Sequence, residues 1–469
     1  MKAATVLALA GVVLILLFAL GLRIAPPADA QNRDGNGRGG PRLTHGATAG
    51  DVGARSAVLW ARADGPATVT FELSLDPAFD GARRIPVSVQ EGTDFVAKAV
   101  VEGLQPNALY EYRVWAEREG QRSDPIQGRF RTAPQSDAGE AITLLWSADL
   151  GGQGRCRRPE YEIFRAMAAV PADLFLLLGD SIYADGVCPS PPNEPGSEFN
   201  AAFLKTLEAY RAKHRYNRAD PPFLALLART PVVAVWDDHE VMNDFVGTEV
   251  DPELLRLGRQ ALREYYPIHE EPDDPHRLYR AFRWGKHLEL LVLDTRQYRV
   301  PGETMLGGEQ LRWLLERIER SDATWLAIAS SVTLSVARGC PRCDGWADGL
   351  PGEPTGYERE LAQIAERLEA LGRRNVVFLT GDVHHPRALS YDPDGDGDRD
   401  FLEFTAGPLS ASARLSSLPD PTFRPRTLYI DGGFFNFGVL RVSEEGVLTV
   451  EFRDATGRAR FQRAFEPVE

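Results

Sequence analysis

The stretch PVVAVWDDHEVMNDF, Pro231–Phe245, decides the fold that we expect for this chain of 469 residues. Val232–Val235 is an unbroken apolar run, which is typical of a strand covered on both faces of a sheet. Three carboxylates and an imidazole follow the run closely, on Asp237, Asp238, His239 and Glu240. A solvated loop and a functional site explain this one stretch equally well, so the ends of the other strands decide between them.

Three further apolar runs end in the same way. From Gln135 onward, apolar strands alternate with helical stretches, a pattern that indicates βαβ units and a largely parallel sheet. Ligands of such sheets gather at the carboxyl ends of the strands. The runs near Leu144, Leu174 and Val376 deliver these side chains to that edge: Asp149, Asp180, Tyr183, Asp382, His384 and His385.

A metal cluster accounts for this convergence. Crowded carboxylates repel one another and lose hydration unless a cation holds them, and a neutral imidazole is a good ligand for a transition metal. Several aspartates, one or two histidines and no thiolate favour a pair of cations about 3.5 to 4 Å apart, with a bridging carboxylate and a hydroxide between them. We expect Asp180 to be the bridge and His385 to point away.

The tyrosine and the two adjacent aspartates need separate treatment. Tyr183 binds a metal only if its phenol ionises, which asks for a strong Lewis acid such as Fe(III); otherwise it is a hydrogen-bonding neighbour. Consecutive strand residues face opposite ways, so we expect Asp238 to point at the metals and Asp237 to orient a neighbour.

Two residues beyond these strand ends are candidates for contact with a substrate. Asn243 supports a metal ligand, faces the substrate or caps an ordinary loop. Arg296, in LDTRQYR, donates hydrogen bonds from its guanidinium group to phosphate oxygens or forms a surface ion pair with Asp294.

Residues 43–134 have a different pattern, with short alternating strands separated by turns. This spacing predicts a small all-β sandwich. Tyr110 and Tyr112 follow a proline turn in GLQPNALYEYRV, which resembles the tyrosine corner of fibronectin type III-like domains. We therefore expect a supporting fibronectin III-like sandwich at 43–134 and the catalytic domain at 135–469.

The N-terminus predicts export. Residues 1–30 contain Lys2, a long apolar run and the small-x-small motif Ala28-Asp29-Ala30, as in a signal peptide, and residues 31–42 form a polar, glycine-rich tether. The apolar run almost spans a bilayer, so an N-terminal membrane anchor or cell-surface association is the alternative to a secreted or periplasmic protein. Export makes disulfides plausible, and we expect Cys156 to pair with Cys188 and Cys340 with Cys343.

Composition limits the class of partner. The net charge of −14 argues against a nucleic-acid-binding surface, and 43% hydrophobic residues indicate an ordinary folded protein.

Five boxes carry a family resemblance, in the order SADLGGQ, GDSIYAD, WDDHEVMND, LDTRQYR and TGDVHH. With the sandwich before them, they resemble the PhoD-type alkaline phosphatases of the calcineurin-like metallophosphoesterase superfamily, which share features with purple acid phosphatases. The likeness covers nearly the whole mature chain. It implies a four-layer α/β/β/α fold with two central sheets.

The resemblance also implies roles for single residues. Asp149, Asp180, Tyr183 and His384 would hold one metal ion. Asp180, Asp238 and Asp382 would hold the other. His239 would protonate the leaving oxygen or stabilise charge that builds on the phosphate.

The first box departs from the best-known members, which have a cysteine where this chain has Asp149. Fe(III) with Ca(II), Fe(III) with Zn(II), and a Mn(II) pair all stay open as the metals. Cys156, seven residues further along, is an alternative ligand that we rank below its disulfide.

The expected activity is hydrolysis of phosphate mono- or diesters, by hydroxide bridging the metals, at neutral to alkaline pH. A phospholipase D-like or teichoic-acid phosphodiesterase is the alternative, and an open cleft would favour it. A non-catalytic extracellular binding protein is the third reading, disfavoured because every expected ligand position is filled.

An acidic segment, DPDGDGDRDFLE, fits the pattern of a calcium-binding loop. No helices flank it, so the alternative is an acidic hairpin with its glutamate in a strand. A structural Ca(II) there would use Asp392, Asp394, Asp396, Asp398 and Glu403.

Overall fold

The computed structural model describes residues 40–152, 156–157, 159–186, 205–338 and 344–468. The expected signal peptide lies outside the described residues, as do Cys188, Cys340 and Cys343. The signal peptide and both disulfide pairings therefore stay predictions. In the part of the chain that is described, no helix combines the length and apolar character needed to cross a bilayer.

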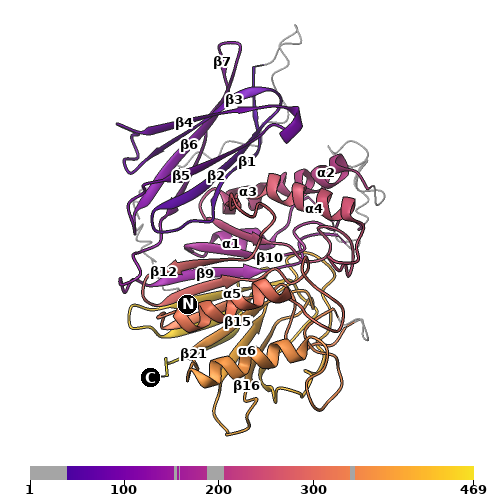
Figure 1. Ribbon diagram of the computed structural model, residues 1–469. Helices are drawn as coiled ribbons and strands as arrows, with labels where there is room; N and C mark the ends of the chain where they lie inside the picture. Colours follow the sequence, from indigo (N-terminus) through magenta and orange to yellow (C-terminus); the bar gives the residue numbers. More distant parts are fainter. Residues whose placement is uncertain (1–39, 153–155, 158, 187–204, 339–343, 469) are drawn as a thin grey trace, which may run out of the picture. The chain divides into compact units, whose positions relative to one another are not determined.

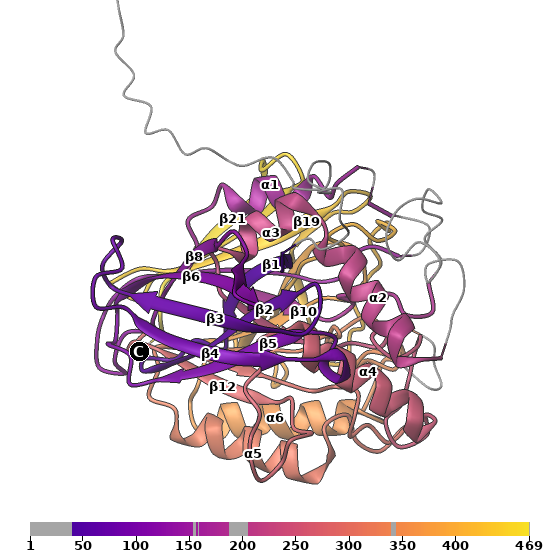
Figure 2. The ribbon, with the colours of Figure 1, turned by 90° about the horizontal axis from the view of Figure 1, so that it is seen from above.

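The N-terminal strands form a sandwich whose two sheets share one apolar core (Figures 1 and 2). One sheet has the order β4-β3-β6-β7, with β8 also paired to β6. The Gln105 N–H donates to the Tyr110 hydroxyl over 2.9 Å and so fixes the turn before β6. The strands of this sheet are β3 (Ala67–Ser74), β4 (Arg83–Val89), β6 (Leu109–Arg118), β7 (Gln121–Arg122) and β8 (Ile126–Arg131).

The second sheet of the sandwich continues into the part of the chain that follows residue 134. Nine strands follow one another in the order β21-β20-β19-β9-β10-β11-β1-β2-β5, and β9, β10, β11 and β1 run parallel. A short 3-10 helix, η1 (Glu91–Thr93), precedes β5. The strands are β1 (Leu43–Gly50), β2 (Ser56–Ala63), β5 (Val96–Glu102), β9 (Ile142–Ser147), β10 (Leu174–Leu178), β11 (Val232–Val235), β19 (Asn436–Val442), β20 (Leu448–Asp454) and β21 (Ala459–Phe465).

Glycine is required where strand β1 of the sandwich meets strand β11 of the nine-stranded sheet. Gly50, the last residue of β1, lies opposite Val232, the first residue of β11. A Cβ on Gly50 would lie 2.3 Å from the Val232 carbonyl oxygen and 2.4 Å from the ring of Pro267. The two strands approach this closely only because residue 50 has no side chain.

A second central sheet has seven strands in the order β12-β13-β14-β15-β17-β16-β18. β13, β14, β15 and β17 run parallel, and all five residues of β14 and of β15 are buried. The strands are β12 (Arg280–Trp284), β13 (Leu288–Val292), β14 (Trp325–Ala329), β15 (Val376–Thr380), β16 (Arg387–Tyr391), β17 (Phe401–Thr405) and β18 (Arg426–Ile430).

Helices cover the outer faces of both sheets, which confirms the predicted four layers. One apolar core contains both sheets and residues of α1 to α4, and a second core lies between the seven-stranded sheet and α5 and α6 (Figure 1). The helices are α1 (Ile163–Ala168), α2 (Leu207–Arg218), α3 (Pro221–Leu227), α4 (Pro252–Tyr265), α5 (Gly307–Arg320) and α6 (Glu358–Ala370).

Candidate metal centre

Four predicted site residues adopt a left-handed backbone just after their strands end. Asp149 follows β9, Asp180 follows β10, and Asp382 and His384 follow β15, with φ values of 65°, 50°, 68° and 60°. Such a conformation costs a non-glycine residue on the order of 1 to 3 kcal/mol, and it persists where the surroundings over-determine it. Residues of this kind cluster at functional sites, so the strain points to this edge of the sheets.

The first group of ligands joins Asp149, Asp180 and His384, whose ligand atoms all lie within 4.8 Å of one another. His384 Nδ1 lies 2.7 Å from the carbonyl oxygen of Ser412 and donates to it, so Nε2 is the ring nitrogen that can accept a metal ion. Burial lowers the pKa of His384 to about 3, so the imidazole stays neutral. Its Nε2 lies 3.8 Å from Asp149 Oδ1 and 3.4 Å from the Tyr183 hydroxyl.

The second group shares one residue with the first. Asp180, Asp238 and His239 also have their ligand atoms within 4.8 Å of one another. The backbone N–H of His239 donates to Asp180 Oδ1 over 3.2 Å. Asp180 therefore belongs to both groups, as a residue that bridges two ions would.

Several carboxylate oxygens of the centre are buried without a hydrogen-bond donor. Both oxygens of Asp149 and Oδ1 of Asp238 are of this kind. Burial raises the pKa of Asp149 well above its usual range, and the charge on Asp382 adds to the shift. Burial and the charge on Asp238 do the same to the pKa of Asp180. Burying ionised carboxylates without hydrogen-bond donors costs folding free energy unless cations neutralise them. The carboxylate oxygens of the centre, together with the neutral imidazole of His384, therefore fit a pair of cations.

His239 is held by a carboxylate that the sequence did not single out. Its Nδ1 lies 2.6 Å from Asp185 Oδ1, and its ring lies 4.1 Å from the ring of Tyr183. The backbone N–H of Asn243 donates to the other oxygen of Asp185 over 2.8 Å. Asn243 itself is exposed, and its side chain donates to Asp244 over 2.8 Å.

Asp382 lies near the centre but in neither group. Its Oδ1 accepts a hydrogen bond from Arg338 Nη1 over 2.9 Å. Burial raises the pKa of Asp382 to about 7 although Arg338 opposes this. Arg338 is partly exposed, and the neighbouring Asp382, Asp344 and Asp238 all favour its charge. The sequence did not indicate this cation.

Arg296 is fully buried, in place of the expected contact with phosphate or a surface ion pair with Asp294. Its Nε donates to Asp237 Oδ1 over 2.6 Å, and its Nη1 donates to Asp344. Ser331 Oγ donates to the same oxygen of Asp237 over 2.7 Å. Arg296 and Asp237 thus hold the loops that carry the centre, while Asp238 faces it.

Glu240 joins the ends of β10 and β11. Its two carboxylate oxygens accept the backbone N–H groups of Asp180, Ser181 and Asp237, over 3.1, 2.6 and 2.9 Å. It is fully buried. These hydrogen bonds depend on a contact between two strands. In the sequence, the position of Glu240 after an apolar run was the only indication of them.

The acidic loop forms only part of the expected calcium site. Asp392, Asp394 and Asp400 place ligand atoms within 4.8 Å of one another, whereas Asp396 and Asp398 form ion pairs with Arg374. Glu403 does not reach this loop, which corrects the expected ligand set. It is fully buried in β17, where it accepts hydrogen bonds from Tyr391, Leu334 and Thr380.

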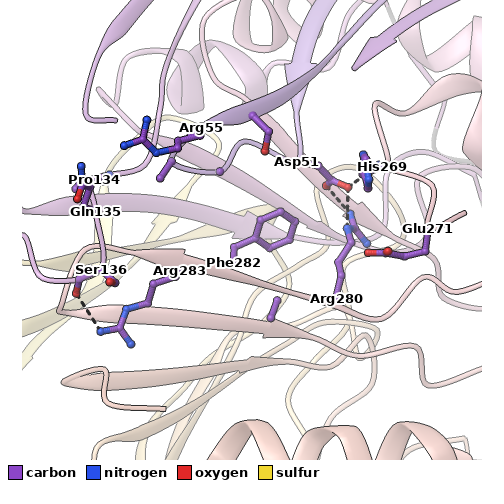
Figure 3. A pocket seen from close by; sticks show the side chains of 14 residues that line it. Asp51, Arg55, Pro134, Gln135, Ser136, His269, Glu271, Arg280, Phe282 and Arg283 are labelled. Carbon is purple, nitrogen blue, oxygen red and sulfur yellow. Dashed lines mark hydrogen bonds and ion pairs between the residues drawn. The ribbon is translucent and has the colours of Figure 1, made fainter. Parts of the chain in front are cut away.

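A cavity outside the ligand groups lies among the described residues. It has a volume of about 480 Å³ and is lined by the turn after β1, residues 134–136 and β12. Figure 3 shows Arg280 paired with both oxygens of Asp51 at one end and Arg283 bonded to Ser136 at the other. None of its lining residues belongs to the two ligand groups. The ends of the strands, and not this cavity, carry the two ligand groups.

Comparison with known proteins identifies a family for this chain. Residues 148–427 match the PhoD-like phosphatase family, and residues 28–134 match the N-terminal domain of that family. Alkaline phosphatase D of Bacillus subtilis (strain 168) is 30% identical over 405 residues, which cover 73% of this chain and 64% of that protein. The chain thus spans slightly less than two thirds of this relative.

Two solved structures share the fold. A structure of PhoD, 23% identical, superposes with a TM-score of 0.75 over 90% of both chains. The purple acid phosphatase PPD1 of yellow lupin, Lupinus luteus, is 13% identical, with a TM-score of 0.62 over 90% of this chain and 73% of that one. Sequence match and fold together show that this chain belongs to the PhoD-like phosphatase family.

Proposed function

We propose that this protein is a metal-dependent phosphoesterase that hydrolyses phosphate mono- or diesters. The observation that carries the proposal is Asp180, which belongs to two buried ligand groups at once. Two cations held there would supply a nucleophile from water and neutralise the phosphate. Asp149 and His384 would complete one ion's ligands, and Asp238 would bind the other.

The remaining residues of the centre would position groups or move a proton. His239 is placed to protonate the leaving oxygen or to stabilise its charge, with Asp185 fixing its ring. Tyr183 lies near enough to His384 to join that metal as a phenolate or to donate a hydrogen bond. Asp382, whose Oδ1 accepts a hydrogen bond from Arg338, would bind the second ion with Asp238, and Arg296 would position Asp237.

The test is hydrolysis of mono- and bis-p-nitrophenyl phosphate by the full chain loaded with metal. We expect Asp180→Asn to lose activity and bound metal together, measured by p-nitrophenol release and elemental analysis. Asp51→Asn is the matched control, since Asp51 is also a buried aspartate but pairs with Arg280 and belongs to neither ligand group. Full activity of the Asp180 variant would end the proposal, and the preferred ester would distinguish phosphatase from diesterase.

One observation favours an amphiphilic diester, as in a phospholipase D-like reaction. The loop that carries Ser412, the partner of His384, also exposes Leu415 by 83% and Leu418 by 90%. Exposed leucines beside a phosphoesterase centre suit an apolar chain attached to the phosphate. Replacing both by serine should lower activity on phospholipid vesicles and spare soluble esters; equal loss on both substrates would contradict this reading.

The organisation of the chain follows the same proposal. We place a leader at 1–30, a tether at 31–42, the sandwich at 43–134 and the catalytic domain at 135–469, in an exported protein with disulfides at Cys156–Cys188 and Cys340–Cys343. The elements on either side of residue 135 and the match of residues 28–134 support the boundary. Intact mass of the exported protein, before and after reduction, tests the leader and the disulfides.

A further inference from the structure

Three carboxylates meet outside the metal centre, where two loops come together. Asp348 lies between β14 and α6, Glu358 begins α6, and Asp420 lies between β17 and β18. Their ligand oxygens all lie within 4.8 Å of one another. Glu358 and Asp420 are buried and Asp348 is half-buried, so this is not a solvated surface cluster.

Asp420 carries an oxygen that no donor satisfies. Its Oδ1 accepts the N–H of Thr422 over 2.8 Å, while Oδ2 is buried without a hydrogen-bond partner. The residue is only 8% exposed, so bulk water does not replace the missing donor. A buried carboxylate oxygen in this state points to a cation.

Glu358 is also poorly compensated. Its two oxygens accept the N–H groups of Asp348 and Thr355 over 3.3 and 3.2 Å, which are long hydrogen bonds. Burial raises the pKa of Glu358 to about 7, and the charges on Asp348 and Asp420 add to the shift.

We propose that Asp348, Glu358 and Asp420 bind a calcium ion that ties these two loops together. Ca²⁺ accepts about six to eight oxygen ligands in flexible geometry, whereas Mg²⁺ demands a near-ideal octahedron. Two further oxygens beside the three carboxylates could add to the ligands. The Thr355 hydroxyl donates to Asp348, and the Leu350 carbonyl accepts a hydrogen bond from the Thr422 hydroxyl over 3.4 Å.

The loops that this ion ties both lead to the catalytic centre. Four residues before Asp348, Asp344 accepts the hydrogen bond of Arg296, and eight residues before Asp420, Ser412 holds His384. The calcium ion therefore supports the groups that position the catalytic ligands, without touching a substrate itself.

The first experiment counts bound calcium in the full chain by equilibrium dialysis with ⁴⁵Ca. Asp180→Asn serves as the parent, so that the catalytic centre contributes as little as the chain allows. Adding Asp420→Asn should remove one Ca²⁺ per chain or weaken its binding at least tenfold, while adding Asp454→Asn, another buried aspartate but paired with Arg460, should not. Equal calcium binding in parent and Asp420 variant would overturn the proposal.

A second experiment guards against a variant that does not fold. Asp348 is half-buried, so Asp348→Asn disturbs packing least, and Trp346 lies two residues away as a sensitiser for Tb³⁺. Tb³⁺ emission excited through tryptophan should fall in Asp348→Asn, and added Ca²⁺ should displace the ion from the parent with far greater effect than Mg²⁺. Unchanged emission in a folded variant would count against the site.

Discussion

At the scale of single residues, the pair His239 and Asp185 explains how the imidazole is aimed. Asp185 Oδ1 lies 2.6 Å from His239 Nδ1, so the other ring nitrogen is left for the reaction. Replacing Asp185 by asparagine keeps the size and removes the charge that orients the ring. We expect kcat to fall about 100-fold, a typical share of general acid catalysis, while elemental analysis shows unchanged bound metal.

Asn243→Ala is the control for that variant. Asn243 holds Asp185 through its backbone N–H, which alanine retains, so kcat should stay within a small factor of the native value. A comparable loss of kcat in both variants would show that the loop as a whole matters, and not the carboxylate.

The role of a residue could be predicted from the sequence when its own segment determines that role, and not when a distant segment does. Asp149, Asp180, Asp238 and His384 could be predicted because each follows an apolar run in its own segment. The partner of an ion pair has no such local signal. For Arg296, for example, the sequence offered a phosphate contact or an ion pair with Asp294, whereas its ion pairs are with Asp237 and Asp344, which come from other segments.

At the scale of elements, the junction of β1 and β11 depends on the absence of a side chain at residue 50. Gly50→Ala would put a methyl group 2.3 Å from the Val232 carbonyl oxygen. We expect a loss of about 1 to 3 kcal/mol in the free energy of unfolding, as for other overpacked sites. Urea unfolding measures it, with Gly92→Ala as control because a Cβ there meets no atom within 4 Å. Similar stability of both variants would refute the argument.

The sequence predicted that residues 43–134 form a sandwich, since alternation and turns are local properties. It did not predict that β1 pairs in parallel with β11. Such pairing depends on two strands that meet across more than 180 residues, and neither strand's own pattern names its neighbour. The same limit hid the contacts of Glu240.

At the scale of the whole molecule, Asp94 connects the sandwich to α2. It accepts hydrogen bonds from Arg62 in β2 and Arg215 in α2, over 2.8 and 2.7 Å. Although burial opposes ionisation, these arginines lower the pKa of Asp94 from 3.8 to about 2. Because its pKa is lowered in the folded state, ionised Asp94 adds about 2 kcal/mol to the free energy of unfolding above pH about 4. This stabilisation is lost as the pH falls toward about 2.

Unfolding followed from pH 7 to pH 2 tests this contribution. Asp94→Asn should be less stable at pH 7 and should lose less stability on acidification than the native protein. The exposed Asp80→Asn should behave as the native protein does. Parallel pH profiles for the native protein and Asp94→Asn would contradict the assignment.

Metal removal should also affect the whole molecule. Without cations the buried carboxylates of the centre repel one another, so a chelator should lower Tm of the native protein. In Asp180→Asn one of these charges is absent, and the chelator should lower Tm less. A larger fall in the variant, measured by calorimetry, would be evidence against a cation pair at Asp180.

The pairing of β1 with β11 in the nine-stranded sheet limits which parts of the chain can be removed. Removing residues 43–134 would take away β1 and leave the apolar β11 as an edge strand with unpaired N–H and C=O groups. Exposed edges of this kind invite aggregation. The sandwich therefore covers the β11 edge of the nine-stranded sheet. A protein without residues 43–134 should precipitate and not remain in solution as a smaller active enzyme.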